Sequence, residues 1–139
     1  MGEIRVNVEL KNHSDIVLSK QGSGRKRPIR QTTVDAMVDT GAVMVLLPED
    51  LVEKLGLERY GKTVVALAGD RKVEMDVAGT IELKIGDRSW ITDCLVGPPT
   101  CEPLIGQLVL ERLDLIVDPL KRTITPRPES PLLPLLKMK

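Results

Sequence analysis

The sequence predicts a mostly β protein with two short helices, folded as a closed or sandwiched set of strands. Short apolar segments with a period of two recur along the 139-residue chain, and Gly, Asp and Pro separate them. Only two short segments show helical spacing instead. The length fits one domain, and abundant Leu, Val and Ile can form its aliphatic core.

The first half of the chain alternates strands with one helix. Apolar residues at every second position predict a strand over residues 4–10, and residues 32–38 predict another. Residues 16–18 are a candidate short strand between them. A short helix begins at Pro48, because proline suits the first helical turn, and it ends at Gly56.

The second half reads as hairpins followed by a tail. Strands at 63–67 and 71–77 flank a turn at 68–70, and strands at 80–85 and 89–96 flank a turn at Gly86-Asp87. A helical pattern at 109–113 precedes two short strands at 115–117 and 123–125. Prolines after position 126 exclude a regular helix or a central strand there. We therefore expect a domain at 1–126 and a Pro/Leu-rich tail at 127–139.

Composition argues against several classes of function. Twenty basic residues balance twenty acidic ones, and the chain has no Phe, one Tyr and one Trp, too few aromatics for a nucleic-acid stacking surface. We interpret the basic cluster at residues 25–30 as a solvated hairpin tip in preference to a nucleic-acid patch. Charges near the N-terminus interrupt any signal-like apolar run, and no run approaches the roughly 20 residues of a membrane span.

These features lead us to expect a cytoplasmic protein that binds neither membrane nor nucleic acid. In that compartment Cys94 and Cys101 are expected to be reduced, partly buried thiols. Together with His13 they provide at most three soft ligands, far apart in sequence, whereas a structural zinc site usually needs four. We expect no metal and no cofactor.

Asp39 is the residue most informative about chemistry. It directly follows the apolar Ala36-Met37-Val38 and precedes more apolar residues, so we expect it near the core, where an isolated carboxylate is costly. Thr40 offers a hydroxyl, and Gly41 permits a tight turn with close backbone approach. The segment is either a loop that presents a carboxylate or an ordinary turn between two strands.

Residues 36–42, Ala-Met-Val-Asp-Thr-Gly-Ala, resemble the active-site segment of retroviral-type (retropepsin-like) aspartic proteases. Residues 94–99 and 103–106, followed by a short helix, resemble the family's second landmark. The hairpin at 64–77 stands where the family has its flap. The order matches, and the chain is most similar to bacterial single-domain members. The resemblance implies a closed, barrel-like acid protease fold with one lobe per chain.

The resemblance also implies a mechanism and a partner. Aspartic proteolysis needs two carboxylates that share a proton. This chain has a single Asp-Thr-Gly. The other candidate acids lack that sequence context and read as turn or surface acids: Asp70, Asp87, Asp93 and Asp114. A homodimer that cleaves peptides or proteins would take Asp39 from each copy. The residues carried over from the family are catalytic Asp39, Thr40 and Gly41, and substrate-binding Ala42, Ala68, Gly69 and Asp70.

The chain departs from the viral pattern at several places, among them the flap tip, which has the single glycine Gly69, and residues 11–30, which have no clear viral counterpart. Val43, Met44 and Val45 stand where viral members carry further acids, and Gln107 stands where they often carry Arg. The alternative reading is a non-catalytic dimerisation or peptide-binding module with the same fold. The Asp at position 39 favours the enzyme, because a binding module could use Asn there equally well.

Overall fold

The computed structural model describes residues 3–21 and 28–138, so the basic residues at 25–27 lie outside the described part of the chain. The elements follow in chain order: β1 (Ile4–Asn12), α1 (His13–Lys20), β2 (Gln31–Val38), β3 (Leu46–Pro48), α2 (Glu49–Lys54), β4 (Glu58–Ala66), the 3-10 turn η1 (Ala68–Asp70), β5 (Lys72–Ile85), β6 (Arg88–Gly97), β7 (Leu104–Ile105), α3 (Gln107–Leu113), β8 (Leu115–Asp118) and β9 (Thr123–Pro126).

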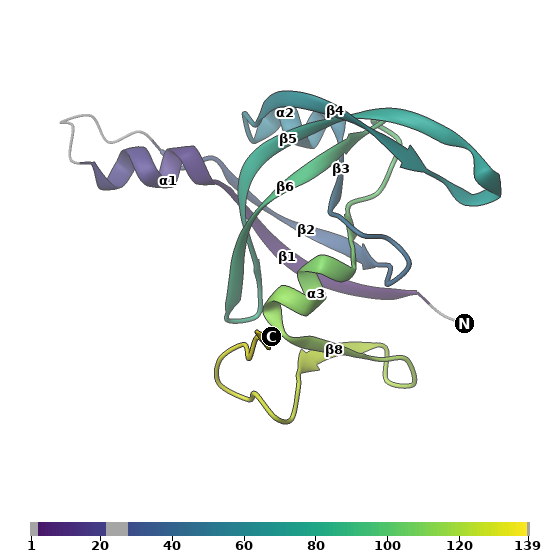
Figure 1. The fold of residues 1–139 in the computed structure, drawn as a ribbon. Helices are drawn as coiled ribbons and strands as arrows, with labels where there is room; N and C mark the ends of the chain where they lie inside the picture. Colours follow the sequence, from purple (N-terminus) through teal and green to yellow (C-terminus); the bar gives the residue numbers. More distant parts are fainter. Residues whose placement is uncertain (1–2, 22–27, 139) are drawn as a thin grey trace.

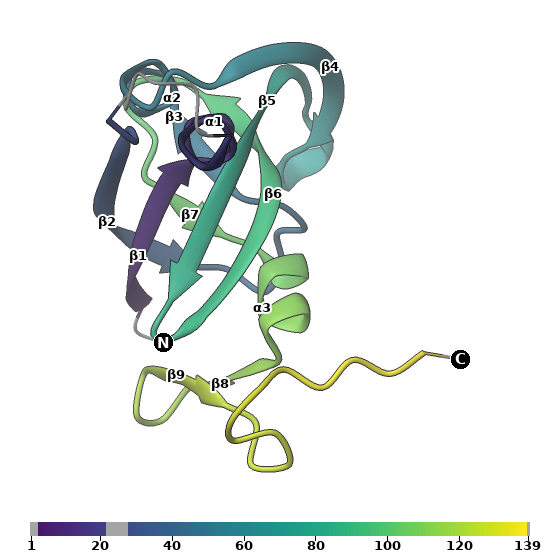
Figure 2. The same ribbon diagram turned by 90° about the vertical axis from the view of Figure 1, so that its left-hand side faces the viewer.

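Six strands close into a barrel. They pair in the order β1-β2-β7-β3-β6-β5, and β5 also pairs with β1 (Figures 1 and 2). Among the described residues, β4 pairs with β5 alone and stands outside this ring. Alternating apolar side chains fill the interior, among them Val8, Leu10, Ile81 and Leu83, all fully buried. The mostly β fold predicted from the period-two segments is therefore confirmed, and so is the closed, barrel-like form that the resemblance implied.

Both predicted hairpins are present. β4 and β5 pair from Glu58↔Gly79 to Ala66↔Lys72 around η1, where Gly69 has φ 78°, a conformation that suits glycine. The second turn, at Gly86-Asp87, joins β5 to β6. The two strands predicted at 71–77 and 80–85 are instead one long strand, β5, with an irregular register between Ala78 and Ile81.

The short strand expected at residues 16–18 is wrong, because this segment is part of helix α1. The Asn12 side chain caps the helix by accepting a hydrogen bond from the Asp15 amide at 3.0 Å. Arg30 then holds Asp15 through two side-chain nitrogens, each 2.9 Å from a carboxylate oxygen. The Asn12 cap and the Asp15–Arg30 ion pair both stabilise the helix, and the pattern of apolar residues reveals neither of them.

The C-terminal elements lie beyond the barrel. β8 and β9 form their own two-stranded sheet, next to α3 in the chain (Figure 1). The tail runs from β9 across this end of the molecule, and Figure 2 shows its final residues extending away from the body. No helix in the described part of the chain is long and apolar enough to cross a membrane.

Candidate active site

Asp39 is the first residue after β2, at a point where three short segments meet. β2 runs parallel to β7, with Val38 opposite Ile105. The Asp39 amide continues this pairing, with its nitrogen 3.0 Å from the Ile105 carbonyl oxygen. β7 also pairs with β3, which follows the loop. Strands on both sides therefore fix the start and the end of the loop at residues 39–45.

The loop is organised around the Asp39 carboxylate. The Gly41 amide donates to Asp39 Oδ1 at 2.9 Å, and the Ala42 amide donates to the Asp39 carbonyl oxygen at 3.1 Å. A carboxylate held by a backbone N–H keeps one orientation without a second side chain. Asp39, Thr40, Gly41 and Ala42, which the sequence predicted as site residues, are thus brought into one turn.

Gly106 and the start of α3 support this loop from behind. The amides of Gln107 and Leu108 donate to the carbonyl oxygens of Ala42 (2.7 Å) and Val43 (3.1 Å). A Cβ atom at Gly106 would lie 2.7 Å from the Met44 carbonyl oxygen and 2.8 Å from that of Ala42. Only glycine allows this close contact. The segment around Gly106, which the sequence indicated as the second landmark, therefore supports the Asp39 loop directly.

Asp39 is exposed, which corrects the expectation that it lies near the core. β2 ends at Val38, so the chain has already left the barrel when it reaches Asp39. Thr40 and Gly41 are exposed as well, and the Thr40 hydroxyl has no hydrogen-bond partner among the described residues. The single chain presents its Asp-Thr-Gly turn to solvent.

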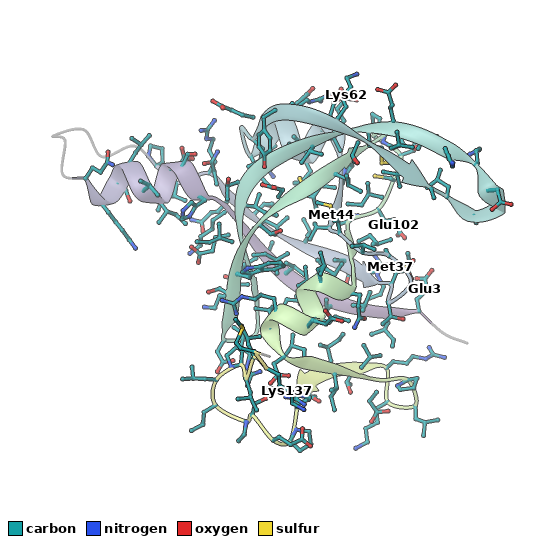
Figure 3. The ribbon with its side chains drawn as sticks, in the orientation of Figure 1. Glu3, Met37, Met44, Lys62, Glu102 and Lys137 are labelled. Carbon is teal, nitrogen blue, oxygen red and sulfur yellow. The ribbon has the colours of Figure 1, made fainter. Side chains whose placement is uncertain are left out.

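A pocket of about 620 Å³ adjoins Asp39 and Thr40. Besides Asp39 and Thr40, its polar lining consists of Glu3 and Arg122, which carry opposite charges. Figure 3 shows Glu3 and Met37, which both line the pocket, on the same side of the molecule. The rest of the lining is apolar and comes from the ends of β1 and β2 and from the β8–β9 hairpin: Ile4, Met37, Val38, Val117, Pro119 and Leu120.

The predicted substrate-binding residues Ala68, Gly69 and Asp70 lie together at the tip of the β4–β5 hairpin. The Leu67 amide donates to the Arg71 carbonyl oxygen at 2.7 Å and closes the tip. All three residues are exposed, and the hairpin extends beyond the barrel (Figure 1). No hydrogen bond in the described ranges joins them to the Asp39 loop, so the two groups of predicted site residues are separate in the single chain.

The cysteines do not provide a competing nucleophile. Burial, with a smaller contribution from neighbouring Asp93, raises the pKa of the Cys94 thiol to about 12. Burial also raises the pKa of Cys101. Neither thiol forms the reactive thiolate readily near neutral pH. Among residues 3–21 and 28–138, no three His, Cys, Asp or Glu side chains are grouped to hold a metal ion.

Sequence reasoning missed a buried polar cluster at the end of α3. Asp114 was expected to be a turn or surface acid, but it is buried and accepts hydrogen bonds from Arg127, from the Ser130 hydroxyl and from the Leu135 amide (2.9 Å). The bonds from Arg127 and Ser130 hold the pKa of Asp114 well below its ordinary value. The donors to the carboxylate all come from the tail, so no local pattern could have revealed this cluster.

The chain matches the family described as gag-polyprotein putative aspartyl protease over residues 27–112, more than half of its length. The matched segment contains the Asp39 loop, the β4–β5 hairpin, Gly106 and most of α3. The chain belongs to this family of retroviral-type aspartyl proteases. A comparison with curated proteins finds no match.

Proposed function

We propose that this protein is an aspartic endopeptidase that works as a homodimer, with Asp39 from each chain forming the catalytic pair. The observation that carries the proposal is the Asp39 turn. One carboxylate oxygen accepts the Gly41 amide at 2.9 Å, and the side chain is held at the surface by a loop fastened to β7 and α3. Membership of an aspartyl protease family supplies the reaction class.

The second carboxylate comes from a second copy of the chain. The sequence has a single Asp-Thr-Gly, and Asp114, a buried alternative, is already occupied by the tail. A twofold axis beside Asp39 brings two identical carboxylates together. The surface there suits such contact, because the neighbouring Val43 and Leu108 side chains are 63% and 43% exposed in the single chain.

The paired carboxylates share one proton, because two adjacent negative charges repel each other. The ionised member takes a proton from a water molecule, which attacks the peptide carbonyl carbon. The protonated member donates its proton to the carbonyl oxygen, which gives a tetrahedral diol. The carboxyl that took the proton from water then gives it to the peptide nitrogen, while the other carboxylate takes a proton from one diol hydroxyl. The C–N bond breaks, the amine and the carboxylic acid leave, and the pair again shares one proton. The Gly41 amide keeps one oxygen of each carboxylate oriented during these transfers.

The β4–β5 hairpin serves as a flap over an extended peptide. Its tip residues, Ala68, Gly69 and Asp70, are exposed and lie at the end of a hairpin whose outer strand, β4, pairs with β5. Main-chain groups near the tip and at Ala42 bind the peptide backbone, as in other complexes with extended peptides. Closure of the hairpin excludes water from the cleavage site.

Cleavage of a peptide library tests the proposal. The Asp39→Asn variant should keep the fold and lose activity by roughly 10²–10⁴-fold, because an amide cannot act as a general base. Asp87→Asn, the same change at an exposed turn between β5 and β6, is the matched control and should cleave like the unchanged protein. Equal cleavage by the Asp39 variant would refute the assignment, and absence of cleavage by all three proteins would favour a binding module.

A further inference from the structure

The turn of the β8–β9 hairpin carries an apolar side chain in a fixed, outward position. Leu120 is 95% exposed. Its backbone is held by Asp118, whose Oδ1 accepts the amides of Leu120 (3.0 Å) and Lys121 (3.1 Å). A leucine on a rigid turn loses little conformational entropy when a partner covers it. Its near-complete exposure makes it unlike the other apolar side chains of this sheet.

The pocket beside Asp39 offers a matching hollow on the same side of the molecule. Ile4, Met37, Val38 and Val117 provide apolar walls, and Leu120 itself forms part of the rim. The rim also carries Glu3 and Arg122. The Arg122 side chain has no hydrogen bond or ion pair among the described residues, whereas Glu3 contacts Arg5 at 3.2 Å. The surface therefore combines a protruding leucine, an apolar hollow and two opposite charges.

We propose that Leu120 of each chain enters the Asp39-side pocket of a second copy, so that the β8–β9 hairpin locks the dimer. The proposal rests on the homodimeric function above. In a twofold dimer the same surface of each chain meets its copy, so the surface must be complementary to itself. The protruding Leu120 and the pocket beside Asp39 lie on one surface and meet this requirement. The pocket contains Asp39 and Thr40, so a partner seated in it lies beside the site that needs a second carboxylate.

The charged rim fits the same arrangement. A twofold axis exchanges equivalent surfaces, so Arg122 of one chain faces the rim of the other, where Glu3 offers a carboxylate. Opposite charges at the edge of an interface mainly fix its register. The hairpin thus determines where one Asp39 lies relative to the other, and Leu120 acts as a positioning residue with no contact with substrate.

Sedimentation of single variants provides the first test. Leu120→Ala should raise the dimer dissociation constant by about 100-fold, since two leucines each lose most of their buried side chain. Leu132→Ala, a change at a leucine that is 82% exposed in the tail, is the matched control and should leave the constant unchanged. Specific activity of the Leu120 variant should recover at high protein concentration, which loss of a catalytic group would not allow.

Disulfide trapping between two differently tagged chains provides the second test. A mixture of Leu120→Cys and Met37→Cys chains should give an interchain cross-link, whereas Leu132→Cys with Met37→Cys should give only the background of the unchanged protein. A dimer with an unchanged dissociation constant for Leu120→Ala, or without the cross-link, overturns this inference and leaves the protease intact. An unchanged protein that stays monomeric at every concentration overturns the homodimeric function itself.

Discussion

Replacement of Gly106 by alanine tests whether α3 positions the Asp39 loop. The added Cβ would lie 2.7–2.8 Å from backbone atoms of Ala42, Val43 and Met44, whereas ordinary van der Waals contact begins at 3.4 Å. The nearest backbone atoms of the loop must therefore retreat by about 0.7 Å to reach ordinary contact. Because misplacement of reacting groups by roughly 1 Å can cost on the order of 10²-fold in rate, we expect kcat to fall by about 10- to 100-fold.

The same change should also lower stability, by about 1–3 kcal/mol, as overpacking usually does. Gly106 has φ −97° and ψ −177°, a conformation open to alanine, so the backbone itself does not resist the change. Without the clash, Gly→Ala would instead stabilise by about 0.4–1 kcal/mol through the unfolded chain. A loss of stability in the Gly106 variant therefore indicates the clash, whereas a gain would indicate only the lower entropy of the unfolded chain.

Gly61→Ala is the matched control, because a Cβ there meets no atom within 4 Å. Peptide cleavage kinetics give kcat and KM, and thermal unfolding gives stability, for both variants and the unchanged protein. We expect the Gly61 variant to keep the kcat of the unchanged protein and to unfold at the same or a slightly higher temperature, because no clash opposes the entropic stabilisation. If Gly106→Ala also kept the kcat and the unfolding temperature of the unchanged protein, the proposed support of the Asp39 loop by Gly106 would be wrong.

Four further predictions follow from the site and the tail. Specific activity should fall on dilution, because each site needs two chains, and a fully active monomer would contradict this. Activity should be highest on the acidic side of neutrality, and an optimum above about pH 8 would exclude a shared proton. Asp114→Asn should lower the unfolding temperature at pH 7. Since the folded-state pKa of Asp114 is lowered, its stabilisation is present above the unfolded value of about 3.9, so the difference between variant and unchanged protein should shrink as the pH falls below that value. Truncation after Pro126 removes the tail donors to Asp114 and should also lower the unfolding temperature, and an unchanged temperature would show that these bonds add nothing.

Local sequence determined the strands, the hairpins and the segment with the chemistry. The period of two in residues 4–10 predicts a strand with one buried face, and Val8 and Leu10 are indeed fully buried. Turn residues at 68–70 and 86–87 fixed where the chain reverses. Asp39-Thr40-Gly41, with the later Gly106, indicated the family that the match over residues 27–112 shows. Each of these signals is a short motif that can be recognised without knowing which other segments it contacts.

Contacts between distant residues decided the rest. The parallel pairing of β2 with β7 joins Val38 to Ile105, and it places Asp39 at the surface although its neighbours in sequence are apolar. The burial of Asp114 depends on a tail that returns from more than ten residues away. Likewise the pocket beside Asp39 is built from β1, β2 and the β8–β9 hairpin, which meet only in the folded chain. Periodicity reports which face of a segment is apolar but carries no information about which segment covers it, so only the tertiary structure could show these contacts.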